Sequence, residues 1–494
     1  MSTTMTYVDA LLSLDTDSLT RTVTLSRLPT THPADIYDLA TRLAHPEAIA
    51  RRAEHLSADD LHALATGSPA GAAANALLLA DHTGNALPTV RETVGSLLEE
   101  VSPDQPSTAD LSETAPEPWH AVTALQSLLL TWHGHLVPVT SSGHVPVSAL
   151  ADPARVLDLE PGALAQLSAI AQQAGLLCPV DGGLAVTSRA DDWLVLPTVD
   201  AWRTLADTAA DDDLATIART DAGGAGALAL IGAAQRRWPL GGRWLSRKLT
   251  DQLAQWRTLG LLDAHGAFTA TGAAWLNRDE AALADIAESW PAVTEYGYLY
   301  NHLELLVPGL LPPRLARRLR LLADPVRLVE THTYQVSPSS VRRGRAHGLS
   351  VGEIREFLAS LLRGDLSQPL QYVLDAEDHA PAPTAARPPA LPEITSGSAP
   401  RRSATALRAH ELVDGYRNAD DDERRQGVLT WALREHAPVR LTVRSRDVER
   451  TMTLELTGVS GPRVRGREPG SELERTIPMS AVTQITPEED TWDR

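Results

Sequence analysis

Residues 334–360 read YQVSPSSVRRGRAHGLSVGEIREFLAS, and the helix-capping residues in this stretch predict its local fold. The Ser-Pro pair at 337–338 places a capping hydroxyl before a proline, whose backbone suits the first helical position. Gly348 is the residue type that commonly ends a helix. Ser350 and Glu353 have the spacing of a capping box at the start of the next helix. The stretch therefore predicts a strand followed by two consecutive helices.

The neighbouring sequence extends this stretch into a small α/β domain, which we predict over residues 291–376. The second helix has apolar residues at helical spacing, and these predict a buried stripe of Val351, Ile354, Phe357, Leu358 and Leu361. Further elements are expected from periodicity and turn residues. They are a strand over 296–307 that ends at Pro308-Gly309, a basic helix from Pro312, two short strands around Thr331–Thr333, helices over 338–347 and 351–362, and a helix over about 368–375.

Two earlier stretches repeat one another. They read QQAGLLCPVDGGLAVTSRADDWL (172–194) and RTLGLLDAHGAFTATGAAWL (257–276). Each predicts a helix that ends in Gly-Leu-Leu, then a strand, a glycine turn, a second strand and a helix start. A helix followed by a two-stranded hairpin is the second half of a winged-helix domain. We therefore predict winged helices over 119–205 and 206–290, which would bind either DNA or other proteins.

The rest of the chain divides into a helical start, two linkers and a β-rich end. Apolar residues three and four apart predict a helical N-terminal domain over 1–100. Proline-rich and polar composition predicts linkers over 101–118 and 377–403. A helix over 404–436 and then alternating strands predict a helix plus a small five-stranded, barrel-like module over 404–494. The expected fold class is mainly α with small α/β and all-β parts, in several domains.

Composition excludes several kinds of catalytic site. Lys248 is the only lysine among the 494 residues, and it lies in RWLSRKLTD, which is not a P-loop. No lysine remains for a nucleotide-binding motif, so an NTP-driven motor is not expected. His133 and His135 form an H-x-H pair without a third ligand at metal-binding spacing. We expect no catalytic residues, no metal and no cofactor.

Cysteine usage and apolar runs predict the compartment. Cys178 is the only cysteine, which excludes a disulfide within one chain, and it follows an apolar run that predicts a core position. The sequence has no run of about 18 apolar residues that would cross a membrane. Its acidic and polar start does not have the form of a secretory signal. The expected location is the cytoplasm, with association with the nucleoid if the chain binds DNA.

The net charge of −19 requires any binding to nucleic acid to come from local basic patches. One patch runs from Arg314 to Arg345, where arginines far outnumber acidic residues. A second candidate is the predicted groove-docking helix of the second winged helix. The candidate nucleic-acid-binding residues are Arg314, Arg317, Arg318, Arg342, Arg343 and Arg345 in the patch and Arg243, Arg247 and Lys248 in the helix. The alternative is a solvated face whose arginines pair with acidic segments such as 211–213.

Two other charged features have simpler interpretations. Arg463, Arg465 and Arg467 predict an exposed hairpin tip that contacts phosphate or a partner, or else a solvated loop. The acidic runs 211–213 and 420–423 are expected to be solvated turns rather than divalent-metal sites.

The pattern Y-x-V-S-P-S-S-V-R-R, followed by G-x-S-x-x-E-I-x-x-F-L and LSQPLQYVLD, resembles a bacterial helicase-associated domain related to the N-terminal region of the XPB helicase. LLVPGLLPPRLARRL and HGAFTATGAAWL resemble the preceding parts of the same proteins. The resemblance covers roughly residues 25–376 and implies winged helices before the α/β domain. Tyr300 and His302 stand where that family usually has Gln and Asp. Residues 438–488 resemble a WYL domain, although the Trp-Tyr-Leu signature is absent.

The resemblance implies a role in DNA transactions beside an XPB-type helicase. Together with the missing nucleotide motifs, it favours a non-catalytic DNA-binding or helicase-accessory protein in DNA repair or processing. One alternative is a protein–protein interaction scaffold that does not bind DNA. Another is a transcriptional regulator that senses a ligand through its β-rich end. DNA, an XPB-type helicase or another protein is the expected partner, and a membrane is not.

Overall fold

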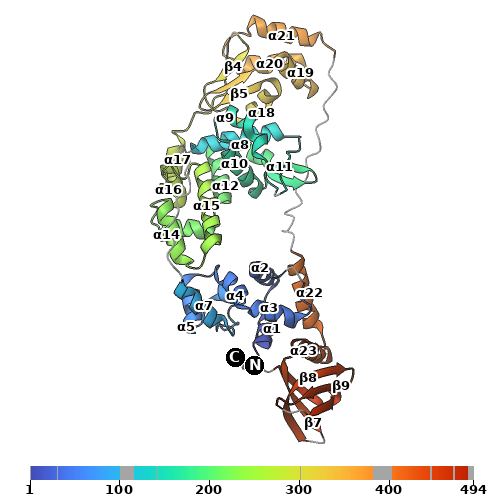
Figure 1. The fold of residues 1–494 in the computed structure, drawn as a ribbon. Coiled ribbons are helices and arrows are strands. Elements are labelled where there is room, and N and C mark those ends of the chain that lie inside the picture. Colours follow the sequence, from blue (N-terminus) through green and yellow to red (C-terminus); the bar gives the residue numbers. More distant parts are fainter. Residues whose placement is uncertain are drawn as a thin grey trace. The chain divides into compact units, whose positions relative to one another are not determined.

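The structure is a computed structural model that describes residues 2–29, 32–100, 116–141, 143–300, 302–381, 403–445, 448–470 and 473–487. These residues are mostly helical, with three small antiparallel sheets among them (Figure 1). The predicted fold class, mainly α with small α/β and all-β parts, is confirmed. Most residues of the two predicted linkers lie outside the described ranges. No helix in the described part of the chain is both long and apolar enough to cross a membrane.

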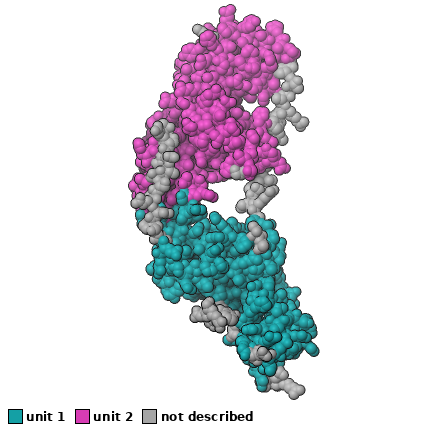
Figure 2. Space-filling model, in the orientation of Figure 1, with its two compact units in different colours: residues 1–105, 235–246, 399–494 teal, residues 106–234, 247–398 magenta. Residues whose placement is uncertain are grey.

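The chain forms two compact units, coloured separately in Figure 2. Unit 1 comprises residues 1–105, 235–246 and 399–494, and unit 2 comprises residues 106–234 and 247–398.

Unit 1 combines the N-terminal helices with the C-terminal elements in one hydrophobic core. The helices are α1 (Thr3–Ser13), α2 (Thr16–Ser26), α3 (Ile36–Ala44), α4 (Pro46–Ala53), α5 (Ala58–Thr66), α6 (Ala72–Ala76), α7 (Val90–Glu100), α22 (Ala404–Asn418) and α23 (Asp421–Glu435). The strands are β7 (Pro438–Ser445), β8 (Val448–Ser460), β9 (Arg463–Arg467), β10 (Glu474–Pro478) and β11 (Val482–Pro487). They form the predicted five-stranded sheet, in the order β10-β9-β8-β7-β11.

Helices α22 and α23 join the two ends of the chain within this unit. Helix α22 packs against α2 and α3, and α23 packs against β8 and β11. The ring of Tyr37 lies 5.9 Å from the rings of both Tyr416 and Trp431, measured between centroids. The helix predicted over 404–436 is therefore two helices. The acidic run 420–423 separates them because Asp420 and Glu423 form a capping box at the start of α23.

The buried guanidinium of Arg52 connects the ends of several helices of unit 1. Its side chain is fully buried, and it donates to the carbonyls of Leu43 at the end of α3 and of Leu77 and Leu78 after α6. Burial lowers the pKa of Arg52 to about 10, and the nearby Tyr7 hydroxyl acts in the opposite direction. The guanidinium has five donors, so it satisfies carbonyls that no helix hydrogen bond reaches.

We predict that Arg52→Met destabilises unit 1 by about 3 kcal/mol, because the buried carbonyls lose a charged donor. Hydrogen exchange of peptides from α3, α4 and α6 should show the loss as faster exchange. Arg21→Met, at an exposed position on α2, is the matched control and should leave exchange unchanged. Equal exchange in the two variants would contradict the structural role of Arg52.

Unit 2 begins with two helical regions. The first contains α8 (Pro118–Trp132), α9 (Ala151–Leu157), α10 (Pro161–Gln173), β1 (Leu177–Val180), β2 (Gly183–Val186), α11 (Ser188–Trp193) and α12 (Thr198–Ala209). The second contains α13 (Asp212–Thr220), α14 (Ala227–Arg237), α15 (Gly242–Thr258), α16 (Ala270–Leu276) and α17 (Glu280–Ala287), of which residues 235–246 cluster with unit 1.

The two predicted hairpins differ in extent. In the first region β1 and β2 pair antiparallel from Leu177↔Val186 onward, as predicted, and Cys178 is half-buried rather than in the core. In the second region the pairing is a single bridge, Leu262↔Phe268. There the Asp263 side chain accepts from the backbone N–H groups of His265 and Ala267, both at 2.8 Å. Such side-chain bonds favour a turn over a longer strand ladder.

The third part of unit 2 is the α/β domain. Its elements are β3 (Tyr298–Leu299), β4 (Glu304–Val307), α18 (Pro313–Leu322), β5 (Asp324–Leu328), β6 (His332–Gln335), α19 (Pro338–Ala346), α20 (Val351–Leu361) and α21 (Gln368–Asp378). The strands pair antiparallel in the order β3-β4-β6-β5. Ser337 and Ser350 cap α19 and α20, and Gly348 follows α19 with a φ of 92°, as the sequence predicted.

The strand predicted over 296–307 is instead two strands joined by a turn. The Tyr300 N–H donates to the Glu304 carbonyl at 2.8 Å, and Leu303 adopts a φ of 61°. A bulky residue rarely takes this left-handed conformation. Residues 300–303 read YNHL and include neither glycine nor proline, which are the strongest turn signals in a sequence.

Candidate nucleic-acid interface

Helix α18 carries the first three candidate arginines on its solvent-exposed side. Its apolar residues Leu319 and Leu322 are buried, which turns the opposite side outward. Exposed guanidinium groups therefore follow one another along this helix. Arginine suits the bidentate contacts that a phosphate offers.

Each of these guanidinium groups already has a partner within unit 2. Arg314 pairs with Glu295 at 2.7 Å, and Arg317 pairs with Asp191 of α11 at 2.9 Å. The guanidinium of Arg318 lies 4.7 Å above the centre of the Phe357 ring. Exposed ion pairs contribute about 0–1 kcal/mol, because water screens them. A phosphate could therefore replace the carboxylates at modest cost.

Two candidate arginines of α19 instead hold a buried carboxylate. Arg342 donates to Glu377 Oε1 at 2.6 Å, and Arg345 lies 3.4 Å from Glu377 Oε2. The side chains of Glu377 and Arg345 are only 5% and 12% exposed. Arg345 also donates to the Ala380 carbonyl at 3.1 Å. Arg345 therefore fastens α21 to α19, whereas Arg342 keeps an exposed side chain beside the same carboxylate.

Arg343 connects α19 to the end of α18. It pairs with Asp324 at 2.8 Å and donates to the Arg320 carbonyl at 3.2 Å. Its side chain is partly exposed, so Arg343 makes a structural contact and still presents part of its side chain to solvent.

The three candidates on α15 have different environments. Arg243 and Arg247 are exposed and have no ion pair with the residues that the structure describes. Lys248 pairs with Asp211, the N-cap residue of α13, at 2.8 Å. Asp211, the first residue of the acidic run 211–213, thus pairs with α15. The nine candidates form three sets, on α18, α19 and α15.

Two arginines of the patch attach the α/β domain to the first helical region. Arg320 contacts the Ser127 carbonyl of α8 at 3.4 Å and the Thr131 hydroxyl, and burial lowers its pKa. Arg327 pairs with Asp158 after α9 at 3.1 Å. The local sequence indicates a basic helix and strand but not these contacts, because the residues that bind the two arginines lie far away in the chain.

Two buried histidines lie at the same junction. His120 of α8 and His332 of β6 are both less than a tenth exposed. Burial lowers the pKa of His120, and burial followed by repulsion from His120 lowers the pKa of His332 to about 4. Neither ring nitrogen of His332 has a hydrogen-bond partner among the described residues. Both side chains are therefore neutral at pH 7.

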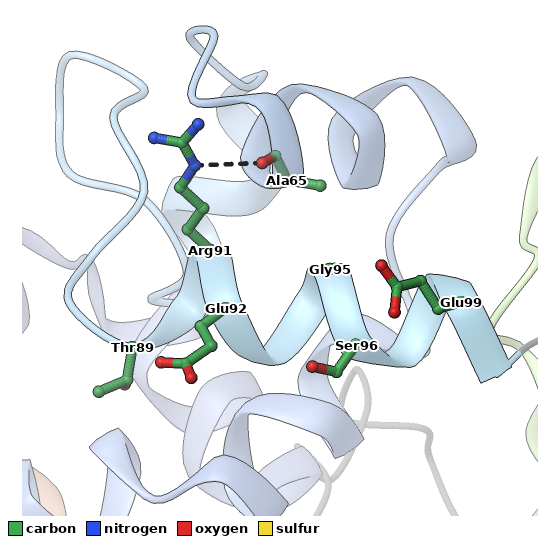
Figure 3. A pocket seen from close by; sticks show the side chains of 7 residues that line it. All are labelled: Ala65, Thr89, Arg91, Glu92, Gly95, Ser96 and Glu99. Atoms are coloured by element: carbon green, nitrogen blue, oxygen red, sulfur yellow. Dashed lines mark hydrogen bonds between the residues drawn. The ribbon is translucent and has the colours of Figure 1, made fainter.

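The described ranges of the chain contain no group of three side chains that could hold a metal ion. A hollow of about 530 Å³ lies along α7 and is lined by Ala65, Thr89, Arg91, Glu92, Gly95, Ser96 and Glu99 (Figure 3). In Figure 3 Arg91 points toward α5, where it donates to the Ala65 carbonyl, while Glu92 and Ser96 point away from it. The polar groups do not converge on one point.

The three arginines of the β-rich end lie on one side of β9. Arg463, Arg465 and Arg467 are exposed, and Val464 and Gly466 between them are buried. The alternation is that of a strand with one solvated face. These arginines belong to unit 1, whereas the patch belongs to unit 2.

Comparison with known proteins supports one part of the resemblance seen in the sequence. Residues 298–379 match the family described as the helicase conserved C-terminal domain. The matched residues run from β3 to the end of α21, so they coincide with the α/β domain that carries the arginines of α18 and α19. No curated protein matches the chain.

We predict that Glu377→Gln destabilises the α/β domain by about 3 kcal/mol, because Arg345 would keep a buried charge without its partner. Urea unfolding measures the loss in the free energy of unfolding, and hydrogen exchange of peptides from α21 shows whether this helix loses protection. Asp378→Asn, at the exposed neighbouring position, is the control. Unchanged protection of α21 in Glu377→Gln would show that the Arg345–Glu377 pair does not hold this helix.

Acid should weaken unit 2 through His332. The ordinary pKa of histidine is 6.5 and the folded-state pKa of His332 is about 4, so only the unfolded chain gains this proton as the pH falls between these values. The full shift corresponds to about 3 kcal/mol of lost stability. His332→Phe should lose this part of the pH dependence in urea unfolding, and the exposed control His135→Phe should retain it. An unaltered pH profile in His332→Phe would refute the assignment.

Proposed function

We propose that the chain is a non-catalytic DNA-binding or helicase-accessory protein that acts with an XPB-type helicase in DNA repair or processing. The observation that carries the proposal is the match of residues 298–379 to a helicase-associated family, on a domain whose helix α18 presents exposed arginines. In this proposal α18 contacts the phosphate backbone. Backbone contacts position a protein on DNA without reading its sequence.

The remaining candidate residues extend the proposed surface. Arg342 and Arg343 would contribute through their exposed portions, and Arg345 would support the domain from inside. We propose that the two helical regions before the α/β domain are winged helices, the second of which would contact DNA through Arg243 and Arg247 of α15. Lys248 would be available only after leaving Asp211.

The proposed absence of catalysis rests on the sequence. The single lysine is engaged with Asp211 and lies in no nucleotide-binding motif. ATP turnover would then be supplied by the partner helicase. Measurable ATP hydrolysis by the pure chain would contradict this part of the proposal.

A second candidate function is an interaction scaffold, and specific contacts favour it. The arginines of α18 and α19 have partners within unit 2, and the whole chain carries a net charge of −19. A scaffold would use these surfaces for proteins, and pulldown of its partners would survive nuclease treatment.

We predict that replacing Arg314, Arg317 and Arg318 together by Ala weakens DNA binding on all sequences. Each lost phosphate contact should lower the log–log salt slope on duplex DNA by about 0.9. Fluorescence anisotropy of the full chain between about 50 and 200 mM salt measures both effects. The matched control replaces three exposed arginines elsewhere, Arg21, Arg155 and Arg236, with the same change in net charge. Equal slopes in both variants would remove α18 from the interface, and no binding by the parent chain would favour the scaffold.

A further inference from the structure

The four-stranded sheet of the α/β domain has one buried and one open face. Directly paired residues lie on the same face, so Leu305 and Tyr334 share the face that is buried in the domain. The opposite face carries Leu306 and Thr333, which are only half-buried. In Figure 1 β4 and β5 lie at the left edge of the domain, with α19, α20 and α21 to their right. The second face is therefore the more exposed face of the sheet, and we call it the open face.

Tyrosine side chains line this open face along β3. Tyr298 pairs with Leu306 and thus lies on the open face. Tyr296 and Tyr300 flank β3, two residues before and after Tyr298, and continue the same alternation. Tyr298 is 37% exposed and Tyr300 is 55% exposed. The centres of the Tyr296 and Tyr298 rings are 5.8 Å apart, with their planes nearly perpendicular.

A guanidinium group completes the row. The Arg363 guanidinium lies 3.6 Å from the centre of the Tyr296 ring, and the Arg363 side chain is exposed. At this distance the cation interacts with the ring face. Arg327, opposite Thr333 on β5, adds a second exposed guanidinium to the same face.

Backbone hydrogen bonds hold the row in place on both sides. The Gly297 N–H donates to the Leu361 carbonyl at 2.8 Å, and the Arg363 N–H donates to the Gly297 carbonyl at 2.9 Å. On the other side β3 pairs with β4. The segment after α20 therefore positions Arg363 beside the tyrosines, and the rings project from a backbone that is paired on both sides.

We propose that this open face binds single-stranded nucleic acid by stacking its unpaired bases on Tyr298 and Tyr300, with Arg363 holding the adjacent phosphate. The inference rests on the proposed function and names the form of nucleic acid that the domain takes. Aromatic side chains on an antiparallel sheet stack bases without sequence readout, since every base has a π face. A duplex keeps its base faces covered, so this surface selects unpaired strands.

The charges on the face agree with this orientation. Arg363 lies at the Tyr296 end of the row, whereas the exposed Glu304 lies opposite Tyr300. Asp324, at the same end of the sheet, is neutralised by Arg343. Phosphate is therefore favoured near Arg363, and the tyrosine rings meet bases. This placement is independent of the α18 arginines, which carry the phosphate contacts of the proposed function.

The test compares the full-length chain with a Tyr298→Ala/Tyr300→Ala double variant by fluorescence anisotropy. The probes are a short labelled oligothymidine, an abasic strand of the same length and a blunt duplex. We expect roughly a tenfold loss of affinity for oligothymidine for each lost base contact, with unchanged affinity for the abasic strand and the duplex. The salt slope should stay the same, because no phosphate contact is removed.

Two further variants make the test specific. The Tyr298→Phe/Tyr300→Phe variant keeps the rings and should bind oligothymidine like the parent chain. Tyr372→Ala removes a tyrosine that is 76% exposed on α21 and should have no effect. Equal loss on the abasic strand, or no loss on oligothymidine, would overturn the stacking platform while leaving α18 binding intact. A parent chain that binds none of the probes would overturn the proposed function and this inference together.

Discussion

Helix α18 contacts the first helical region through Arg320 and carries its other arginines on an exposed side. Arg320 is inserted against α8, where the Ser127 carbonyl and the Thr131 hydroxyl accept its hydrogen bonds. The half-buried guanidinium needs these acceptors, since a charge that loses water without gaining a partner is costly. The contact therefore fixes the α/β domain on the first helical region, and the exposed arginines of the same helix are held in a defined direction.

The arginine patch illustrates why basic composition alone is a poor guide to a nucleic-acid site. Arg345 is used inside the domain, where it neutralises Glu377, and Arg327 reaches Asp158 of the neighbouring region. Arg314 and Arg317 remain exposed beside carboxylates that water already screens. Burial separates Arg345 from the other three arginines, because a buried pair cannot exchange its partner without leaving an unpaired charge in a low dielectric.

The two proposed surfaces of the α/β domain would divide the recognition of nucleic acid between them. Guanidinium groups on α18 suit phosphates, which every nucleic acid presents, and the tyrosines of β3 suit base faces, which only unpaired strands present. The proposed helicase partner would generate such strands from duplex. Residues 298–379, which match the helicase conserved C-terminal domain, carry both proposed surfaces.

The sequence by itself determined the features that depend on neighbours a few residues away. The Ser337 and Ser350 caps, the helix end at Gly348 and the apolar stripe of α20 all arise from bonds or contacts within one or two helical turns. Only the tertiary structure decided that residues 1–100 and 404–494 share a core, that Arg345 meets Glu377, and that a turn at Leu303 creates the tyrosine face. The physical reason is that burial and pairing across long sequence separations depend on how whole elements pack, which local propensity does not specify.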